Sequence, residues 1–119
     1  TCALPIYNYG GIFIMATTAT TLFRGAATTT TTTTLYTVPN TTTSTVVTNI
    51  AVTNTGSSAY TFTLTLDGID LHTATAIAAN TTVYIDCKQV LAANATPKTI
   101  KGGASNTAVN FHISGVEIS

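Results

Sequence analysis

The sequence has 119 residues, enough for one domain with its own core and too few for two. Charged side chains make up 7% of it and balance to a net charge of zero, whereas typical soluble domains carry about 25%. Because the few basic residues form no clustered positive face and no stretch approaches the roughly 18 apolar residues of a membrane span, we expect neither nucleic-acid binding nor membrane insertion.

Residues 1–14 differ in composition from the rest of the chain. The segment TCALPIYNYGGIFI contains one threonine, whereas threonine dominates immediately after Met15. We therefore expect Met15 to be the natural start. The alternative is that the segment belongs to the protein and that Ile12, Phe13 and Ile14 form a short apolar strand. The segment lacks the basic beginning and the unbroken apolar stretch of a secretory signal peptide.

The chain after Met15 is predicted to be extended. Thr17–Phe23 is rich in β-branched and aromatic residues, which favour strands. The seven threonines of Thr28–Thr34 indicate an extended connector or an edge strand, because threonine prefers extended backbone. We divide the chain into an N-terminal extension, 1–34, and a β-sandwich domain, 35–119. The candidate donor strand for a neighbouring subunit comprises Ile12, Phe13, Ile14, Thr17, Thr21, Leu22 and Phe23.

The middle of the chain carries the clearest strand pattern. In Tyr60–Leu66, large apolar residues at even positions alternate with threonine at odd positions, the period of a sheet with one buried and one exposed face. Asp67-Gly68 is a hairpin-turn signal, so Ile69–His72 is predicted as the return strand. Thr45–Thr53 is predicted as the strand before them.

Short strands and their inward faces define the expected core. Further strands are predicted at Leu35–Val38, Thr82–Cys87, Thr99–Lys101 and Ala108–Ser114. Gln89–Ala93 is expected to form one helical turn at most, and Gly115 to mark a bulge, because glycine weakens a strand interior. The expected core comprises Val46, Ile50, Val52, Tyr60, Phe62, Leu64, Leu66, Val83, Ile85, Val109, Phe111 and Ile113.

The spacing of these segments predicts an all-β fold. No window shows a sustained period of 3.6 residues, so helix is not expected. Short strands with turns about every 8–12 residues favour a two-sheet antiparallel sandwich, immunoglobulin-like or jelly-roll-like, with an N-terminal extension strand. The Cys…Trp…Cys pattern of antibody domains is missing, since the chain has no tryptophan.

The ionisable side chains form no catalytic motif. No Ser-His-Asp order, phosphate loop or acidic pair occurs at motif spacing, so we expect neither an enzyme nor a cofactor. Asp67 is explained as a turn former, and Lys98 and Lys101 as solvated loop charges. A metal site would need ligands that converge from separate strands and is not expected; its candidates are Asp70, His72 and Asp86.

Sugar binding is harder to dismiss than catalysis. Tyr36 and Tyr84 are candidates for stacking on glycan rings, whereas Tyr60 shares the face of Phe62 and is better explained as core. Three N-x-Ser/Thr sequons, which abundant threonine produces by chance, begin at Asn40, Asn80 and Asn94. Glycans, bound or attached, are therefore candidate partners.

Several sequence motifs carry a resemblance to known proteins. They are LYTVP, TFTLTLDGIDLH, IAANTTVYID and AVNFHISGVEI, all of them packing motifs between Leu35 and Ile118. In these the chain resembles small, mostly uncharacterised proteins encoded in bacteriophage genomes. The resemblance implies a virion or fibre surface component and supplies no catalytic residues. The layout also resembles donor-strand fibre subunits, in which an N-terminal extension completes the sheet of a neighbour.

Composition and layout together predict a structural subunit that associates with copies of itself. Thirty threonines take the place of charged residues, so little electrostatic repulsion keeps neighbours apart. We expect a homo-oligomeric, helical or fibrillar assembly in an extracellular fibril or on a virion surface, formed through a β-edge or N-terminal strand exchange. The alternatives are a phage capsid or tail decoration protein that folds as an independent domain and binds virion proteins, and a carbohydrate-binding module. Whether Thr17–Phe23 pairs within its own chain or with a neighbour stays open at this point.

Overall fold

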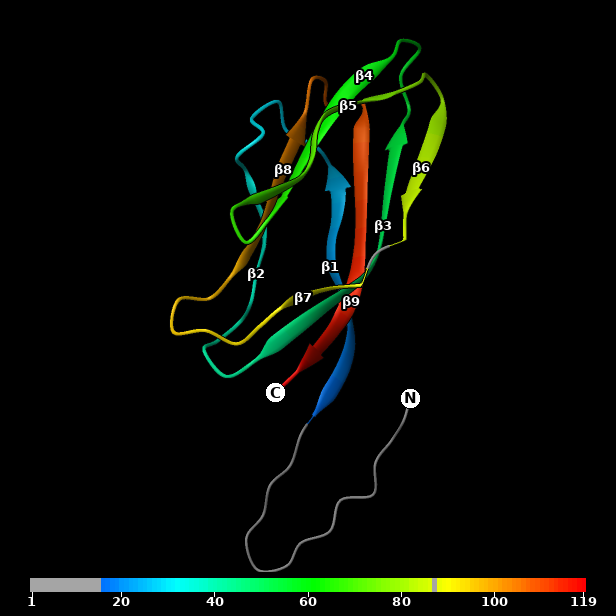
Figure 1. Ribbon diagram of the computed structural model, residues 1–119. Helices are drawn as coiled ribbons and strands as arrows, with labels where there is room; N and C mark the ends of the chain where they lie inside the picture. The colour runs from blue at the N-terminus through cyan, green and yellow to red at the C-terminus, as the bar shows by residue number, and fades with distance from the viewer. Residues whose placement is uncertain (1–15, 87) are drawn as a thin grey trace, which may run out of the picture.

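The computed structural model describes residues 16–86 and 88–119. These residues form nine β-strands (Figure 1). The strands in chain order are β1 (Thr17–Ala26), β2 (Thr34–Thr37), β3 (Ser44–Asn54), β4 (Tyr60–Leu66), β5 (Ile69–Ile77), β6 (Thr81–Ile85), β7 (Gln89–Leu91), β8 (Thr99–Ala104) and β9 (Val109–Ile118). The described part of the chain contains no helix that has the length and apolar character to cross a membrane.

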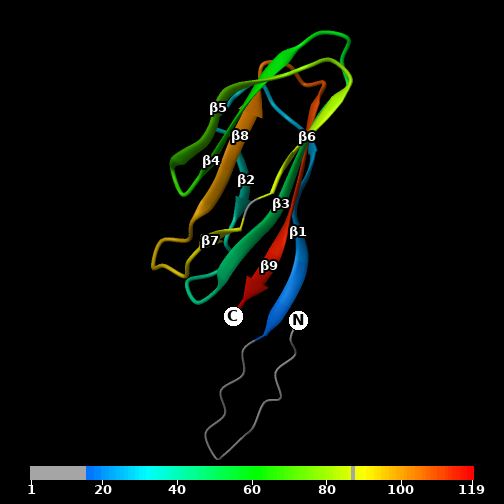
Figure 2. The same ribbon diagram turned by 45° about the vertical axis from the view of Figure 1, so that its right-hand side comes forward.

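The strands form two antiparallel sheets that pack face to face. The five-stranded sheet has the order β1-β9-β3-β6. Strands β6 and β7 both pair with the same edge of β3, β7 near the start of β3 and β6 near its end. The four-stranded sheet has the order β2-β8-β4-β5. Figures 1 and 2 show the two layers from directions 45° apart. The predicted two-sheet antiparallel sandwich is therefore confirmed.

The strand pairing identifies the sandwich as a jelly roll. Apart from the short β7, the strands pair first with last (β1 with β9), second with next to last (β2 with β8), and so inward through β3 with β6 to β4 with β5. Such pairing is that of one long antiparallel hairpin rolled into two sheets. Of the two sandwich types that the sequence left open, the structure has the jelly-roll type.

The core lies between the sheets, where two phenylalanines from opposite layers meet. Phe62 of β4 and Phe111 of β9 are 1% and 0% exposed, and their rings pack edge to face with centroids 6.3 Å apart. Five other predicted core residues are fully buried: Ile50, Val52, Leu64, Val109 and Ile113. Leu66 is buried at the end of β4, and three residues are half-buried against the core: Tyr60, Val83 and Ile85. Burial of one apolar face of each sheet holds the two layers together.

Two β-bulges flank the central strand β9. Leu22 interrupts the register of β1 with β9, and Thr48 interrupts the register of β3 with β9. The prediction that Val46 lies in the core is wrong, because the bulge at Thr48 shifts the alternation by one residue. Val47 is 0% exposed, whereas Val46 is half-buried on the other face of the sheet. The extra residues thus lie on β1 and β3, the strands on either side of Gly115, and not on β9, where the sequence predicted a bulge.

Three connecting segments differ from the predictions. Gln89–Leu91 is a strand, not a helical turn, because it pairs with β3. The return strand β5 continues to Ile77, beyond the predicted end. The threonine run is extended only in part: the backbone N–H of Thr33 donates to the carbonyl of Thr30 at 3.2 Å and closes a turn, and Thr34 begins β2.

Candidate functional site

Strand β1 forms one edge of the five-stranded sheet. Nine of its ten residues pair with β9 of the same chain, from Thr17 opposite Ile118 to Ala26 opposite Asn110, and Leu22 is the exception. Within the part of the chain that the structure describes, no strand pairs with the other side of β1. The strand is thus paired in cis on one side, and its other side is free of any strand among the described residues.

The predicted assembly residues occupy both faces of β1. Leu22 is 7% exposed and Phe23 packs against the core, so these two side chains hold β1 onto the sandwich. Thr17 and Thr21 are exposed. The remaining three, Ile12, Phe13 and Ile14, lie outside the described residues. That residues 1–34 act as a separable extension stays a prediction.

The outer face of the five-stranded sheet carries little charge. One row of apolar side chains crosses four strands at paired positions: Ala19 on β1, Val116 on β9, Val46 on β3 and Val90 on β7. Val90 is 61% exposed, and Tyr84 on β6 is 71% exposed. Arg24 is the one formally charged residue that the described strand registers place on this face. Such a face has little charge to oppose contact with another protein surface.

A hydrogen-bonded group of side chains links the two sheets near the end of β9. The Tyr36 hydroxyl on β2 donates to Glu117 Oε2 on β9, and the Thr45 hydroxyl on β3 lies 2.8 Å from the same Tyr36 oxygen. Burial and, second to it, the hydrogen bond to Glu117 together raise the pKa of Tyr36 to about 12. Tyr36 is therefore half-buried and bonded through its hydroxyl to the other sheet, whereas the sequence had suggested an exposed platform for a sugar ring.

Replacing Tyr36 with phenylalanine is expected to lower the free energy of unfolding by about 1–3 kcal/mol near neutral pH, because Glu117 loses its donor. The raised pKa means that the uncharged tyrosine is favoured by the fold. Its contribution is therefore fully present below the ordinary value of 10.0 and is lost as the pH rises through about 12.

Urea unfolding at about pH 8 and about pH 11.5 measures this difference. The original protein should lose stability between the two pH values and approach the Tyr36→Phe variant. Tyr84→Phe, which alters an exposed tyrosine, is the control. If the stabilities of the original protein and of Tyr36→Phe depend on pH equally, the ionisation of Tyr36 is not the cause of the loss at high pH.

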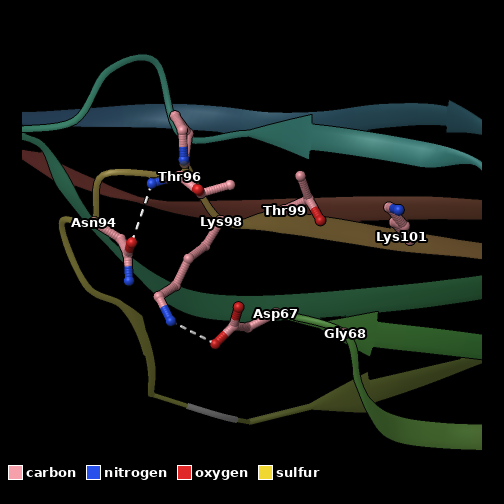
Figure 3. Close-up of a pocket in the computed structure, with 8 residues that line it drawn as sticks. Asp67, Gly68, Asn94, Thr96, Lys98, Thr99 and Lys101 are labelled. Carbon is pink, nitrogen blue, oxygen red and sulfur yellow. Dashed lines mark hydrogen bonds and ion pairs between the residues drawn. The ribbon is translucent and has the colours of Figure 1, made fainter.

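A polar pocket of about 430 Å³ lies between the β4–β5 turn and the connection from β7 to β8 (Figure 3). Its polar lining consists of Asp67, Asn94, Thr96, Lys98, Thr99 and Lys101. Lys98 Nζ donates to Asp67 Oδ2 at 2.6 Å, and the backbone N–H of Asp67 donates to the Thr99 carbonyl at 2.9 Å. These two bonds fix the turn to the connection and set the shape of the pocket.

The sequence indicated the turn at this pocket but not the ion pair. Asp67 and Gly68 have φ values of 54° and 76°, the left-handed backbone that an Asp-Gly hairpin turn requires. The Lys98 side chain, expected to be solvated, is 23% exposed because it lies against Asp67. The two residues are 31 positions apart, and no local pattern signals that they meet.

The three residues considered as metal ligands have other surroundings. The Asp70 carboxylate accepts hydrogen bonds from two threonine hydroxyls. The His72 ring packs against Phe62 with centroids 5.4 Å apart, and Asp86 is exposed beside Lys88, with 3.9 Å between the charged atoms. Across residues 16–86 and 88–119, no group of three or more His, Cys, Asp or Glu residues is placed to hold a metal ion.

Comparisons with known proteins give likenesses of fold alone. No protein-family model and no curated protein matches the sequence. The chain resembles one from the structure of the infectious bursal disease virus Gx strain, with 12% identity and a TM-score of 0.49 over 88% of this chain and 31% of that one. It also resembles a chain of the T13 particle of the same virus, with 11% identity and a TM-score of 0.47 over 87% and 30% of the two chains. A third likeness, to dimeric latent PorU from Porphyromonas gingivalis, has 13% identity and a TM-score of 0.36 over 87% and 10%. This chain thus spans under a third of the length of each of these proteins.

Proposed function

We propose that this protein is a non-enzymatic structural subunit of an extracellular fibril or phage particle, which assembles with copies of itself through β1. The observation that carries the proposal is the edge of β1, ten residues long, with which no other strand in residues 16–86 and 88–119 pairs, on a sheet whose outer face carries little charge. An open edge is a row of backbone donors and acceptors without partners, and a strand from a neighbour satisfies them.

The other sheet edges are less suited to strand addition. Strands β2, β6 and β7 have four, five and three residues. Strand β5 has nine residues, but its pairing with β4 is irregular in two places. On β1 the bulge at Leu22 leaves Thr17–Thr21 as a regular stretch. A neighbouring strand would therefore pair along this first half of β1.

The direction of the free backbone groups follows from the last ladder pair. Ala16 and Ser119 exchange both of their backbone hydrogen bonds, at 3.1 and 3.0 Å. Because such pairs alternate along an antiparallel ladder, the N–H groups of Thr17, Ala19 and Thr21 point away from β9. These three donors are the ones that a neighbouring strand would use.

An Ala19→Pro substitution tests edge addition. Proline removes one outward N–H and keeps the hydrogen bonds to β9. We expect it to raise the concentration at which half of the protein is assembled by roughly tenfold, the equivalent of about one hydrogen bond per contact. Electron microscopy and sedimentation of the full chain measure this, with Ala19→Ser, which keeps the N–H, as the control. Assembly of Ala19→Pro at the unchanged concentration argues against the edge of β1.

Strand exchange is the second route to the same assembly and has its own test. In it, β1 leaves its own β9 and pairs with that of a neighbour, which re-forms the same contacts between chains. A chain that lacks residues 1–26 should then fail to polymerise. If the truncated chain keeps its β-sheet circular dichroism and still forms filaments, strand donation is wrong.

A phage capsid or tail decoration protein is the alternative function. The cis pairing of β1 favours it, because a sandwich with β1 in place is able to fold as an independent domain. Jelly rolls occur in viral capsid and lectin domains, although fold alone assigns no function. Monodisperse monomer at high concentration would favour this alternative and would overturn the fibril proposal.

A further inference from the structure

The polar pocket beside the β4–β5 turn is open to solvent and has the volume of a small-molecule site. Its volume, about 430 Å³, lies within the roughly 300–1,000 Å³ range of small-molecule sites. The ion pair of Lys98 with Asp67 closes one side, and on the other side the Asn94 side-chain oxygen accepts from the Thr96 backbone N–H at 3.0 Å. The ion pair therefore holds one wall to the turn before any ligand arrives, which lowers the ordering entropy lost on binding.

The polar atoms left over in this pocket include both donors and acceptors. Among the described residues, no hydrogen-bond partner is present for Asp67 Oδ1, for Asn94 Nδ2 or for the hydroxyl of Thr99. Figure 3 shows the Lys98 side chain extending between Asn94 and Asp67, with Lys101 farther along β8. A carboxylate oxygen accepts, an amide nitrogen donates and a hydroxyl does both.

This combination selects among the ligands that would fit the pocket. An anionic group would face the free carboxylate oxygen of Asp67, and a cation would face the ammonium groups of Lys98 and Lys101. A neutral polyol meets neither conflict, because each of its hydroxyls donates to one neighbour and accepts from another. Adjacent hydroxyls of a sugar ring would then donate to Asp67 and accept from Asn94.

We propose that this pocket binds a neutral hexose unit of a glycan, with Asp67 and Asn94 as its principal hydrogen-bonding partners. The lining contains no aromatic ring, so a single site should bind in the millimolar range, on the order expected for a few hydrogen bonds. The inference does not depend on self-assembly, and it places the sugar at a different position from Tyr36 and Tyr84.

Saturation-transfer difference NMR on the full chain tests the proposal, because it observes the ligand whatever the size of the protein assembly. The probes are the methyl glycosides of glucose, galactose and mannose. At least one should give a saturable signal, and Asp67→Asn should weaken its binding by roughly fivefold to tenfold through the loss of one charged hydrogen bond. Asparagine tolerates the left-handed backbone of position 67, so this variant keeps the turn.

The control is Asp70→Asn, which removes an exposed carboxylate of the same hairpin outside the pocket lining. It should bind the sugar with unchanged affinity. The proposal is overturned if none of the probes gives a saturable signal up to about 50 mM, a concentration well above millimolar dissociation constants. It is also overturned if Asp67→Asn and the original protein bind equally, or if glucuronate binds more tightly than every neutral probe.

Discussion

Replacing Phe111 with alanine is expected to lower the free energy of unfolding by about 3–5 kcal/mol. Phe111 is 0% exposed on β9, where it is paired with Val52 on one side and Gly25 on the other. Its ring meets Phe62 edge to face across the sandwich, at an interplanar angle of 71°. Truncation would leave a cavity that these backbone ladders prevent from collapsing, so the lost transfer free energy and the cavity add together.

Denaturant unfolding followed by circular dichroism measures the effect of this substitution. The control is Tyr84→Ala, because Tyr84 is 71% exposed and its loss should change stability by less than about 1 kcal/mol. A loss below about 1 kcal/mol for Phe111→Ala would mean that the two sheets do not pack through this pair.

Replacing Gly115 with alanine should destabilise the fold by about 1–3 kcal/mol or more, although it adds a single methyl group. The new Cβ would lie 2.4 Å from the Val46 carbonyl oxygen and 2.9 Å from Leu22 Cδ1. The carbonyl belongs to β3 and cannot retreat without disturbing the ladder between β3 and β9. The strain therefore falls on the central strand of the sheet.

Gly25→Ala is the matched control for this substitution. Gly25 lies on the neighbouring strand β1, where the nearest atom to an added Cβ is Phe23 Cζ at 3.4 Å, an ordinary contact. It should change stability by no more than about 0.5 kcal/mol in either direction. If the two variants unfold at the same denaturant concentration, the close approach of Val46 to Gly115 does not constrain the sheet.

The two layers of the sandwich were predictable because a strand buried on one face alternates apolar and polar residues along the sequence. The alternation of Tyr60–Leu66 indicates which side of β4 is buried, and Phe62 and Leu64 lie there. The same rule failed at Val46, because a bulge adds one residue and exchanges the two faces of the strand. Thr48, the extra residue, has no property that distinguishes it from its neighbours.

The jelly-roll pairing and the candidate site depend on contacts that are distant in sequence. Immunoglobulin-like and jelly-roll sandwiches use strands of similar length and alternation, so the pairing of β1 with β9 was needed to tell them apart. Tyr36 and Glu117 are 81 positions apart, and Asp67 and Lys98 are 31 apart. The sequence around each of these residues accounts for it without a distant partner, so only the fold shows that they meet.

The bulge at Leu22 has a consequence for a chain so rich in one residue. In TTATTLFRGA, the sequence of β1, the threonine and alanine positions are nearly interchangeable, so a displaced alignment against β9 would change few side-chain contacts. Leu22 removes this degeneracy, because its side chain lies over Gly115, where β9 carries no Cβ. Leu22 and Gly115 together fix the register of the threonine-rich strand β1 against β9. They give the chain one alignment, and a filament built by exchange of β1 between chains would keep that same alignment at every contact.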